Sequence, residues 1–244
     1  MGFFKKYHTL NLVSIAMNKV EQLKEEAGIK ACDYVKNGML IGLGTGSTVK
    51  YTIIELARRI NEEALEIKGV PTSIATRDLA TSLGIELVDL DEIDGLDLVI
   101  DGADEFDSSF QLIKGGGAAL LREKIVAQAS KKMIVVADNR KRVDTLGEFP
   151  LPIEITEFCA QTTCKQISTL LNCEVKIRMN GESTLFTDNG NLIVDAFTGP
   201  SINDPVKTES ELLQFAGVVQ VGLFNNMCDV VVMASEDGVV VFEK

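Results

Sequence analysis

Apolar runs alternate with helix-type patterns along the first part of the chain, and this alternation constrains the fold more than any other feature. The apolar runs lie at residues 39–43, 68–73, 85–88, 96–100 and 133–137. The helical patterns lie at residues 20–36, 53–60, 77–83 and 118–130. Continuous apolar strands that alternate with helices are typical of a parallel sheet covered on both faces. The first ~150 residues therefore predict an open, doubly wound, Rossmann-like unit.

The pattern changes after the segment FPLP at residues 149–152. Strand, helix, strand, hairpin, helix and strand patterns follow at residues 153–156, 162–171, 173–179, 188–190, 206–215 and 218–223. This β-α-β-β-α-β order is that of a ferredoxin-like unit, and Asn-Gly at the hairpin tip is a strong turn signal. Two last strand patterns, at residues 230–233 and 239–242, are expected to rejoin the first sheet.

The predicted fold class is therefore α/β: an open, mostly parallel, Rossmann-like sheet with an inserted, smaller ferredoxin-like α+β domain. We expect residues 17–147 with 220–244 to form the larger domain and residues 148–219 the inserted one. Residues 1–16 are interpreted as an N-terminal extension, with the working chain beginning near Met17.

The N-terminal segment faintly resembles a signal peptide, because Lys5 and Lys6 precede a short apolar stretch. Asn11 and Ser14 interrupt that stretch, however, and no small-residue cleavage site follows it. No stretch of the chain approaches the ~20 apolar residues of a membrane span. We therefore expect no membrane partner.

Charge and residue types narrow the chemistry that is available. A formal net charge of −12 argues against nucleic acid as a partner, although local N–H groups and a few lysines can still hold a small anion. His8 is the only histidine, and the five cysteines contain no C-x-x-C pair, so neither a metal site nor a disulfide framework is expected. Carboxylates or lysines must therefore carry out any proton transfer.

A glycine-rich loop, GTGST at residues 44–48, follows the apolar run at 39–43. Glycines allow a tight turn, and the amides at the start of the next helix, with the hydroxyls of Thr45, Ser47 and Thr48, could donate to a phosphate. The alternative is an ordinary strand-to-helix turn with Ser47 or Thr48 as the N-cap. The loop matches neither the Walker nor the G-x-G-x-x-G spacing.

Three carboxylates follow the run at 96–100, in DGADE at residues 101–105. Because neighbouring carboxylates disfavour each other's ionisation, at least one pKa among Asp101, Asp104 and Glu105 should rise toward a range useful for proton transfer if the site is desolvated. Taken alone, such a cluster is more often a solvated turn, and a divalent-ion site is a further alternative.

Three successive glycines, residues 115–117, follow Lys114 and cost backbone entropy, which suggests close approach to a ligand or an unusual backbone path. If the next helix starts near residue 117, Glu123 lies about two turns into it, ~9 Å along the axis. By helix register alone, Glu123 could equally be a surface partner of Lys124 or Lys131.

Several longer motifs occur in a fixed order. They are GTGST at 44–48, DGADE at 101–105, KGGGAALLREK at 114–124, FPLPIE at 149–154, TDNGN at 187–191 and VGLF at 221–224. In these motifs the chain resembles ribose-5-phosphate isomerase of the A type, from about residue 23 to residue 241. The resemblance implies an aldose–ketose isomerase that interconverts D-ribose 5-phosphate and D-ribulose 5-phosphate through an enediolate, in the non-oxidative pentose phosphate pathway and without a cofactor or metal.

The resemblance also assigns roles. It implies that Glu123 moves the proton, that Lys114 stabilises the enediolate charge, and that Asp101 and Asp104 hold hydroxyls and assist ring opening. The implied substrate-binding residues are Lys24, Thr45, Gly46, Ser47, Thr48, Asp101, Gly102, Ala103, Asp104, Lys114, Gly115, Gly116, Gly117 and Lys141. Arg140 is a departure, because the family usually has serine or threonine just before the lysine.

The resemblance further implies a cytoplasmic homodimer or dimer of dimers. The residues agree with the chemistry, since a carboxylate base and a cation suffice for transfer through an enediolate. Two other classes are weighed against it. One is a related phosphosugar or acyl-CoA enzyme, such as an amino-sugar phosphate isomerase-deaminase or a CoA transferase, and the other is a catalytically silent sugar-phosphate sensor. No helix-turn-helix precedes Lys24, and the net charge disfavours a DNA-bound sensor.

Overall fold

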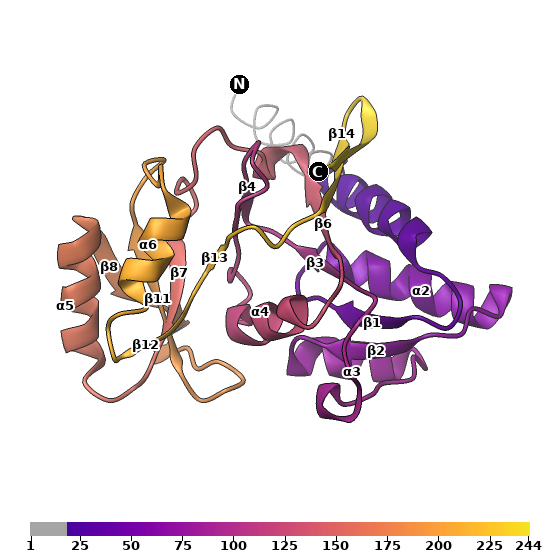
Figure 1. The fold of residues 1–244 in the computed structure, drawn as a ribbon, viewed down its shortest axis with the longest axis horizontal. Helices are drawn as coiled ribbons and strands as arrows, with labels where there is room; N and C mark the ends of the chain where they lie inside the picture. Colours follow the sequence, from indigo (N-terminus) through magenta and orange to yellow (C-terminus); the bar gives the residue numbers. More distant parts are fainter. Residues whose placement is uncertain (1–18) are drawn as a thin grey trace, which may run out of the picture.

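The computed structural model describes residues 19–244, so His8, Met17 and the expected extension at 1–16 lie outside the described residues. The larger of its two main sheets has six strands in the order β15-β14-β6-β3-β1-β2 (Figure 1). The bounds are β1 Leu40–Leu43, β2 Lys68–Pro71, β3 Leu98–Gly102, β6 Met133–Asp138, β14 Val230–Ser235 and β15 Gly238–Glu243. Every pairing is parallel except that of β14 with β15. The mostly parallel sheet is confirmed, and the last two strands do join it.

Helices cover both faces of this sheet, which explains why its strands read as continuous apolar runs. They are a helix at residues 19–31, α2 (Val49–Glu63), α3 (Ile74–Ser82) and α4 (Leu120–Gln128). The helix at 19–31 and α2 pack on one face, where Leu23 and Leu56 join a buried cluster with Ile100. On the opposite face Leu120 and Val126 of α4 pack against β3 and β6.

The second sheet has four antiparallel strands in the order β12-β7-β11-β8. Its elements are β7 Leu151–Ile155, α5 Ala160–Leu171, β8 Glu174–Ile177, β11 Leu192–Phe197, α6 Pro205–Leu212 and β12 Val218–Val221. Numbered within the unit, the strand order is 4-1-3-2, which follows from two β-α-β crossovers that interleave as in ferredoxin-like folds. The predicted ferredoxin-like unit is therefore present. Its core is a separate cluster that includes Ile153, Ile167 and Val194.

A small three-stranded sheet, β13-β5-β4, connects the two units. It consists of β4 (Glu105–Phe106), β5 (Leu112–Ile113) and β13 (Leu223–Phe224), all antiparallel. In Figure 1, β13 runs across the middle of the molecule on its way from β12 to β14. Because β5 turns the chain back toward β3, Lys114 returns to the carboxyl end of the larger sheet.

Side chains of α4 also reach into the four-stranded unit. The ammonium group of Lys124 donates to the carbonyl oxygens of Val221 and Leu223, both at 2.8 Å, and pairs with Glu209 of α6 at 2.5 Å. Two residues earlier, the Arg122 guanidinium donates to the backbone carbonyl of Asp188 at 2.8 Å. Helix α4 is thus attached to the second unit on both sides of Glu123.

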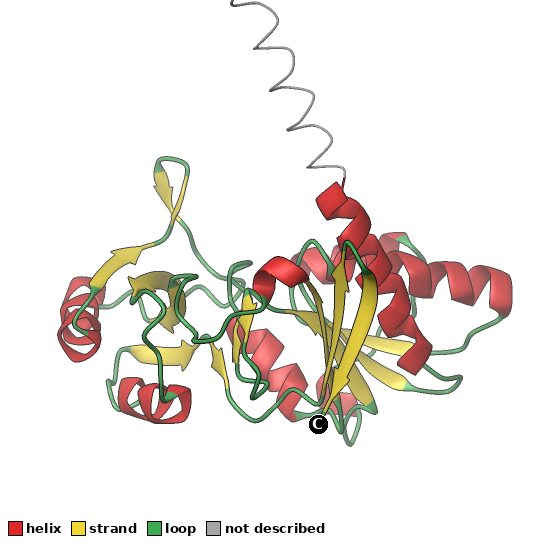
Figure 2. Ribbon diagram, turned by 90° about the horizontal axis from the view of Figure 1, so that it is seen from above, coloured by secondary structure: helices red, strands yellow, loops and turns green. Residues whose placement is uncertain are grey.

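Several predicted elements differ in the structure. The strand expected at 85–88 is a lone bridge between Gly69 and Leu87, and the strand expected at 173–179 is divided into β8 and β9 (Met179–Asn180). Strand β9 pairs with β10 (Ser183–Thr184) in a projecting hairpin that the sequence pattern did not predict (Figure 2). Strand β12 (Val218–Val221) spans the residues at which the boundary between the two domains is expected.

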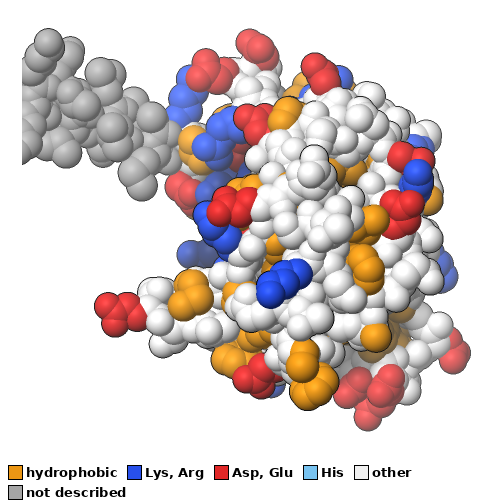
Figure 3. Space-filling view, turned by 90° about the vertical axis from the view of Figure 1, so that its left-hand side faces the viewer, with side chains coloured by type: hydrophobic (Ala, Val, Ile, Leu, Met, Phe, Trp, Pro, Cys, Tyr) orange, Lys and Arg blue, Asp and Glu red, His pale blue; other side chains and the backbone are white. Residues whose placement is uncertain are grey.

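The surface carries charges of both signs. Figure 3 shows the end of the molecule formed by the four-stranded unit, where blue and red side chains are interspersed with small groups of apolar ones. Within residues 19–244, no helix combines the length and the apolar character that crossing a bilayer requires.

The close packing of α4 on the larger sheet predicts a stability effect at Gly42. A Cβ atom there would lie 2.6 Å from Val126 and 2.7 Å from Val99, so Gly42→Ala should push α4 away from β1. We expect the free energy of unfolding in urea to fall by about 1–3 kcal/mol, as for other overpacked cores. Lys165→Ala, on the exposed side of α5, is the control and should change it by less than about 0.5 kcal/mol. An equally small effect of Gly42→Ala would contradict this packing.

Candidate active site

The carboxyl ends of β1, β3 and β6 lie at one edge of the larger sheet, because these strands are parallel. The loop after β1 contains Gly46, whose φ of +132° favours glycine. Thr48 is the N-cap residue of α2 but makes no side-chain capping hydrogen bond. Its hydroxyl therefore does not serve the capping role that an ordinary strand-to-helix turn would give it.

Asp101 stands at the end of β3 and is buried, with 1% of its surface exposed. Its Oδ1 accepts hydrogen bonds from the backbone N–H groups of Thr45 at 3.1 Å and Gly102 at 2.7 Å. A Cβ atom on Gly44 would lie 2.3 Å from this carboxylate, so glycine at 44 is required for the loop to pass so close. The first two sequence motifs thus meet through Asp101.

Lys114 is the centre of the charged cluster, and 2% of its surface is exposed. Its Nζ lies 3.1 Å from Asp101 Oδ2 and 3.2 Å from Glu123 Oε1, and it donates to the carbonyl oxygen of Gly102 at 2.6 Å. Burial alone would lower the pKa of this lysine, but the surrounding carboxylates outweigh it and raise the pKa above its ordinary value. Lys114 is therefore a buried, permanently charged ammonium group.

Glu123 lies in the first turn of α4, not two turns in, because the helix begins at Leu120. It is 3% exposed and pairs with Lys114, so the alternative of a surface partner for Lys124 or Lys131 is wrong. Its Oε2 has no hydrogen-bond partner within the described part of the chain. Burial, followed by the negative charge of Asp101, raises the pKa of Glu123 to about 8 even though Lys114 opposes the shift.

The three carboxylates of DGADE point to different partners. Asp104 Oδ2 accepts from the Gly116 N–H at 2.7 Å, whereas buried Glu105 accepts from the N–H groups of Gly147, at 2.7 Å, and of Phe149. The solvated turn is therefore wrong for Asp101 and Glu105. No group of three His, Cys, Asp or Glu side chains in residues 19–244 is placed to hold a metal ion, so the structure does not support the divalent-ion alternative.

A cavity of about 300 Å³ opens above this cluster. Its lining residues are Lys24, Thr45, Gly46, Ser47, Thr48, Gly102, Ala103, Asp104, Lys114, Gly115, Gly116, Gly117, Glu123, Arg140 and Lys141. Every predicted site residue lines it except Asp101, which lies beneath and contacts Lys114.

Besides Lys114, the cavity is lined by three cationic residues, Lys24, Arg140 and Lys141. Lys24 is paired with Glu21 at 2.6 Å, and Arg140 is paired with buried Asp138 at 2.7 Å. Lys141 lies 5.8 Å above the ring of Phe149. Arg140, which departs from the family pattern, therefore adds a guanidinium group to the cavity wall, although its Nε and Nη2 are occupied by Asp138.

One part of the site was not predicted. The hydroxyl of Thr45 contacts three other hydroxyl groups, those of Thr72 at 2.7 Å, Ser73 at 2.8 Å and Thr76 at 3.1 Å. These residues lie at the end of β2 and the start of α3, so a cluster of hydroxyl residues after a strand was the available signal. The hydroxyl of Thr45 thus connects the glycine loop to the residues that follow β2. Ser47 and Thr48 line the cavity as well.

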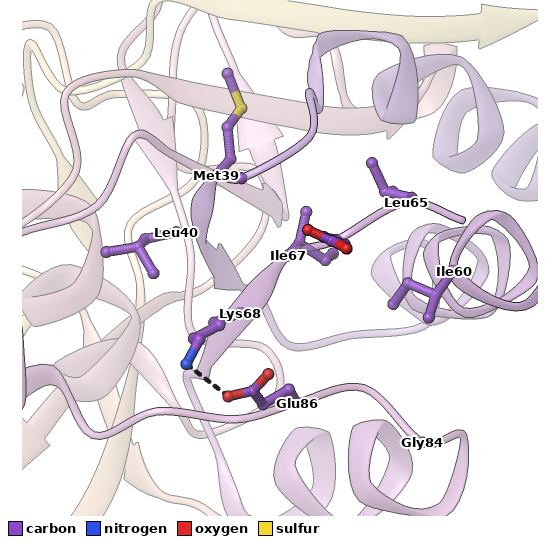
Figure 4. A pocket seen from close by; sticks show the side chains of 10 residues that line it. Met39, Leu40, Ile60, Leu65, Ile67, Lys68, Gly84 and Glu86 are labelled. Atoms are coloured by element: carbon purple, nitrogen blue, oxygen red, sulfur yellow. Dashed lines mark ion pairs between the residues drawn. The ribbon is translucent and has the colours of Figure 1, made fainter. Parts of the chain in front are cut away.

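A second hollow, of about 520 Å³, lies at the opposite edge of the sheet, where β1 and β2 begin (Figure 4). Leu40, Ile60 and Leu65 line it, and Lys68 pairs with Glu86 at 2.6 Å. Although this hollow is larger, it lacks buried, convergent polar groups. Parallel sheets bind ligands at the carboxyl ends of their strands, so the smaller cavity is the candidate active site.

Comparisons with known proteins identify the family of this chain. Residues 68–238 match the family described as ribose 5-phosphate isomerase A (phosphoriboisomerase A). A relative from Bacillus mycoides (strain KBAB4), named ribose-5-phosphate isomerase A, is 51% identical over 217 residues, which are 89% of this chain and 97% of the relative. One from Streptococcus pyogenes serotype M5 is 47% identical over 224 residues, 92% of this chain and 98% of the relative.

Two solved structures are similar over 92% of this chain and 99% of their own. Ribose 5-phosphate isomerase A from Methanocaldococcus jannaschii has a TM-score of 0.87 with 39% identity. A D-ribose-5-phosphate isomerase in complex with phospho-erythronic acid has a TM-score of 0.89 with 38% identity. The resemblance seen in the motifs is confirmed, and this chain belongs to the ribose 5-phosphate isomerase A family.

Proposed function

We propose that this chain is a ribose-5-phosphate isomerase that interconverts D-ribose 5-phosphate and D-ribulose 5-phosphate. The observation that carries the proposal is the buried Glu123–Lys114–Asp101 cluster beneath the cavity. It offers a carboxylate with one oxygen free of hydrogen bonds within the described residues and a pKa of about 8, beside a permanent cation. A base and a cation within reach of one reacting centre are what transfer through an enediolate needs.

In the open-chain aldose, Oε2 of Glu123 takes the proton from C2, and the electron pair moves through C1 onto the aldehyde oxygen. The Lys114 ammonium stabilises the negative charge that develops on that oxygen. Glu123 then returns its proton to C1, and the hydroxyl proton of C2 moves to the C1 oxygen to leave the ketose. Protons and electrons balance over these steps, so the reaction needs no oxidant or reductant.

Substrate binding is assigned to the other residues of the cavity and to Asp101 beneath it. Asp101 and Asp104 are proposed to hold hydroxyl groups and assist ring opening, with Asp104 already fixed by the Gly116 N–H. The loop at 44–48, together with Lys24 and Lys141, is proposed to bind the phosphate. Backbone N–H groups at the start of α2 and the positive end of its dipole favour an anion there.

Family membership also supports three proposals about context. We propose that residues 17–147 with the C-terminal strands form the catalytic domain and that the four-stranded unit is the second domain. We propose that the chain works as a homodimer or dimer of dimers. The proposed setting is the cytoplasm and the non-oxidative pentose phosphate pathway, where a sugar phosphate is the partner.

The activity is tested by incubating the purified chain with ribose 5-phosphate and EDTA in deuterated water. We expect ribulose 5-phosphate to form with deuterium at the reacting carbon, because a carboxylate that exchanges with solvent carries the proton. Loss of activity in EDTA would contradict a metal-free mechanism. Absence of both product and exchange would favour a sugar-phosphate sensor.

Glutamine at position 123 would keep the shape of the side chain but could not act as a base, so this substitution tests the role of Glu123 in proton transfer. Glu123→Gln should lower kcat by at least about 10²–10⁴-fold, the range for loss of a general base. The KM should change little, because the glutamine side chain has nearly the same volume and the phosphate contacts remain. Glu66→Gln, an exposed residue at the distant hollow, is the control. Near-normal turnover in Glu123→Gln would refute the assignment of the base.

The raised pKa of Glu123 predicts a pH dependence of kcat/KM. The carboxyl group must be ionised to accept a proton, and its pKa in the free enzyme is about 8. Below that value kcat/KM should fall about tenfold per pH unit, and above it the rate should level off because Lys114 stays charged. A profile that is flat or decreases as the pH rises from about 6 to 8 would contradict this pKa.

A further inference from the structure

Arg178 lies in the four-stranded unit, between β8 and β9, yet its side chain contacts the glycine loop of the cavity. Its guanidinium Nη1 donates to the carbonyl oxygens of Gly115 at 2.7 Å and Gly116 at 3.1 Å. The side chain is only 15% exposed. A residue about 60 positions away along the chain thus contacts the loop that follows Lys114.

The orientation of this guanidinium is fixed from behind by Asp195 of β11. Nε donates to Oδ2 at 2.9 Å and Nη2 to Oδ1 at 2.5 Å, a two-point contact with a carboxylate that is 17% exposed. Such bidentate pairing defines the plane of the guanidinium, so that Nη1 is left to face the loop. Lysine at 178 could not make all four contacts with its three N–H groups in this planar arrangement.

The contacts determine how two successive peptide groups of the loop are turned. The carbonyl of the Gly115–Gly116 peptide accepts from Arg178, while its N–H donates to Asp104 at 2.7 Å. The carbonyl of the next peptide, Gly116–Gly117, accepts from the same guanidinium. Because no peptide bond in residues 19–244 is cis, the N–H of Gly117 points away from Arg178, as that of Gly116 does.

This loop has little rigidity of its own. Three successive glycines have a wide choice of backbone conformations, and Gly115 has a φ of +111°. A Cβ atom at Gly116 would lie 2.5 Å from Asp104 Oδ1, so side chains that could stiffen the loop are excluded. One hydrogen bond within the loop, from the Ala118 N–H to the Gly115 carbonyl oxygen at 3.0 Å, closes a turn. Contacts from outside complete its conformation, and the Arg178 guanidinium provides those to the carbonyl oxygens of Gly115 and Gly116.

We propose that Arg178 is a positioning residue for the isomerase reaction: oriented by Asp195, it holds residues 115–117 so that the Gly117 N–H donates to the substrate and Asp104 stays aimed at the cavity. A charged donor on the carbonyl also polarises the peptide and strengthens its N–H as a donor. The proposal rests on the proposed function, because its substrate is the same sugar phosphate. It gives the inserted domain a direct part in shaping the active site.

The test compares steady-state kinetics of Arg178→Ala, Arg178→Lys and Asp195→Asn with the wild type. We expect Arg178→Ala to lower kcat/KM for ribose 5-phosphate about 10- to 100-fold, as for loss of a charge-assisted hydrogen bond. Added guanidinium ion at non-denaturing concentration should restore part of that activity. Asp195→Asn keeps the guanidinium group but fixes its orientation less firmly, so its kcat/KM should also fall. The kcat/KM of Arg178→Lys should be closer to that of Arg178→Ala than to that of the wild type.

The control is Lys176→Ala, which removes a cation from β8, two residues before Arg178. The Lys176 ammonium group pairs with exposed Glu174 and lies 5.2 Å from the centre of the Phe197 ring. It should keep full activity and show no response to guanidinium. A purely structural role for Arg178 would appear as a lower Tm with activity that guanidinium does not restore, and that result would overturn the proposal. So would an Arg178→Ala variant within twofold of the wild type. Inactivity of the wild type itself would instead refute the proposed function.

Discussion

A buried ammonium group, that of Lys114, is the interaction on which the rest of the site depends. Burying an unpaired charge is costly, so this lysine can lie beneath the cavity only with Asp101 and Glu123 close by. Those partners come from different elements, the end of β3 and the first turn of α4. The attraction that compensates for burying the lysine therefore also brings together the parts of the proposed catalytic machinery. The positive charge of Lys114 in turn favours the ionised form of the two carboxylates.

The architecture explains why these elements meet. The loops that follow parallel strands all begin at the carboxyl ends of those strands, so the glycine loop after β1 lies beside the carboxylate loop after β3. The antiparallel turn through β4 and β5 then returns the chain so that Lys114 faces back into this edge. From the other side, the four-stranded unit accepts a hydrogen bond from Lys124 of α4 through the Val221 carbonyl oxygen, and its Arg178 donates to the carbonyl oxygens of Gly115 and Gly116. Neither Lys124 nor Arg178 lines the cavity. Chemistry and support are thus divided between the two units.

Much of this could be predicted from the sequence. Continuous apolar runs identified the parallel strands, and the 4-1-3-2 strand order agreed with the β-α-β-β-α-β pattern. Two-residue strands such as β4 and β5 carry too few residues to show a period, so the path that returns Lys114 was not predicted. The start of α4 was misplaced because glycines and alanines gave no clear N-cap signal. The contact of Arg178 with the glycine loop could not be predicted either. From the sequence alone, an arginine in a strand region is indistinguishable from an ordinary surface cation, because its partners are distant in the chain.

The attachment of α4 has a consequence for the modularity of the fold. Arg122 and Lys124 flank Glu123 in the chain, and each is bound to acceptors that belong to the inserted sequence or the strand leaving it. A shortened protein that kept only the Rossmann-like half would retain every group proposed to touch the sugar. It would nevertheless lose Glu209, the carboxylate partner of the buried Lys124 ammonium, and the Asp188 carbonyl oxygen that accepts from Arg122. The insertion is therefore not a removable module, because both chain neighbours of the proposed base have partners in it.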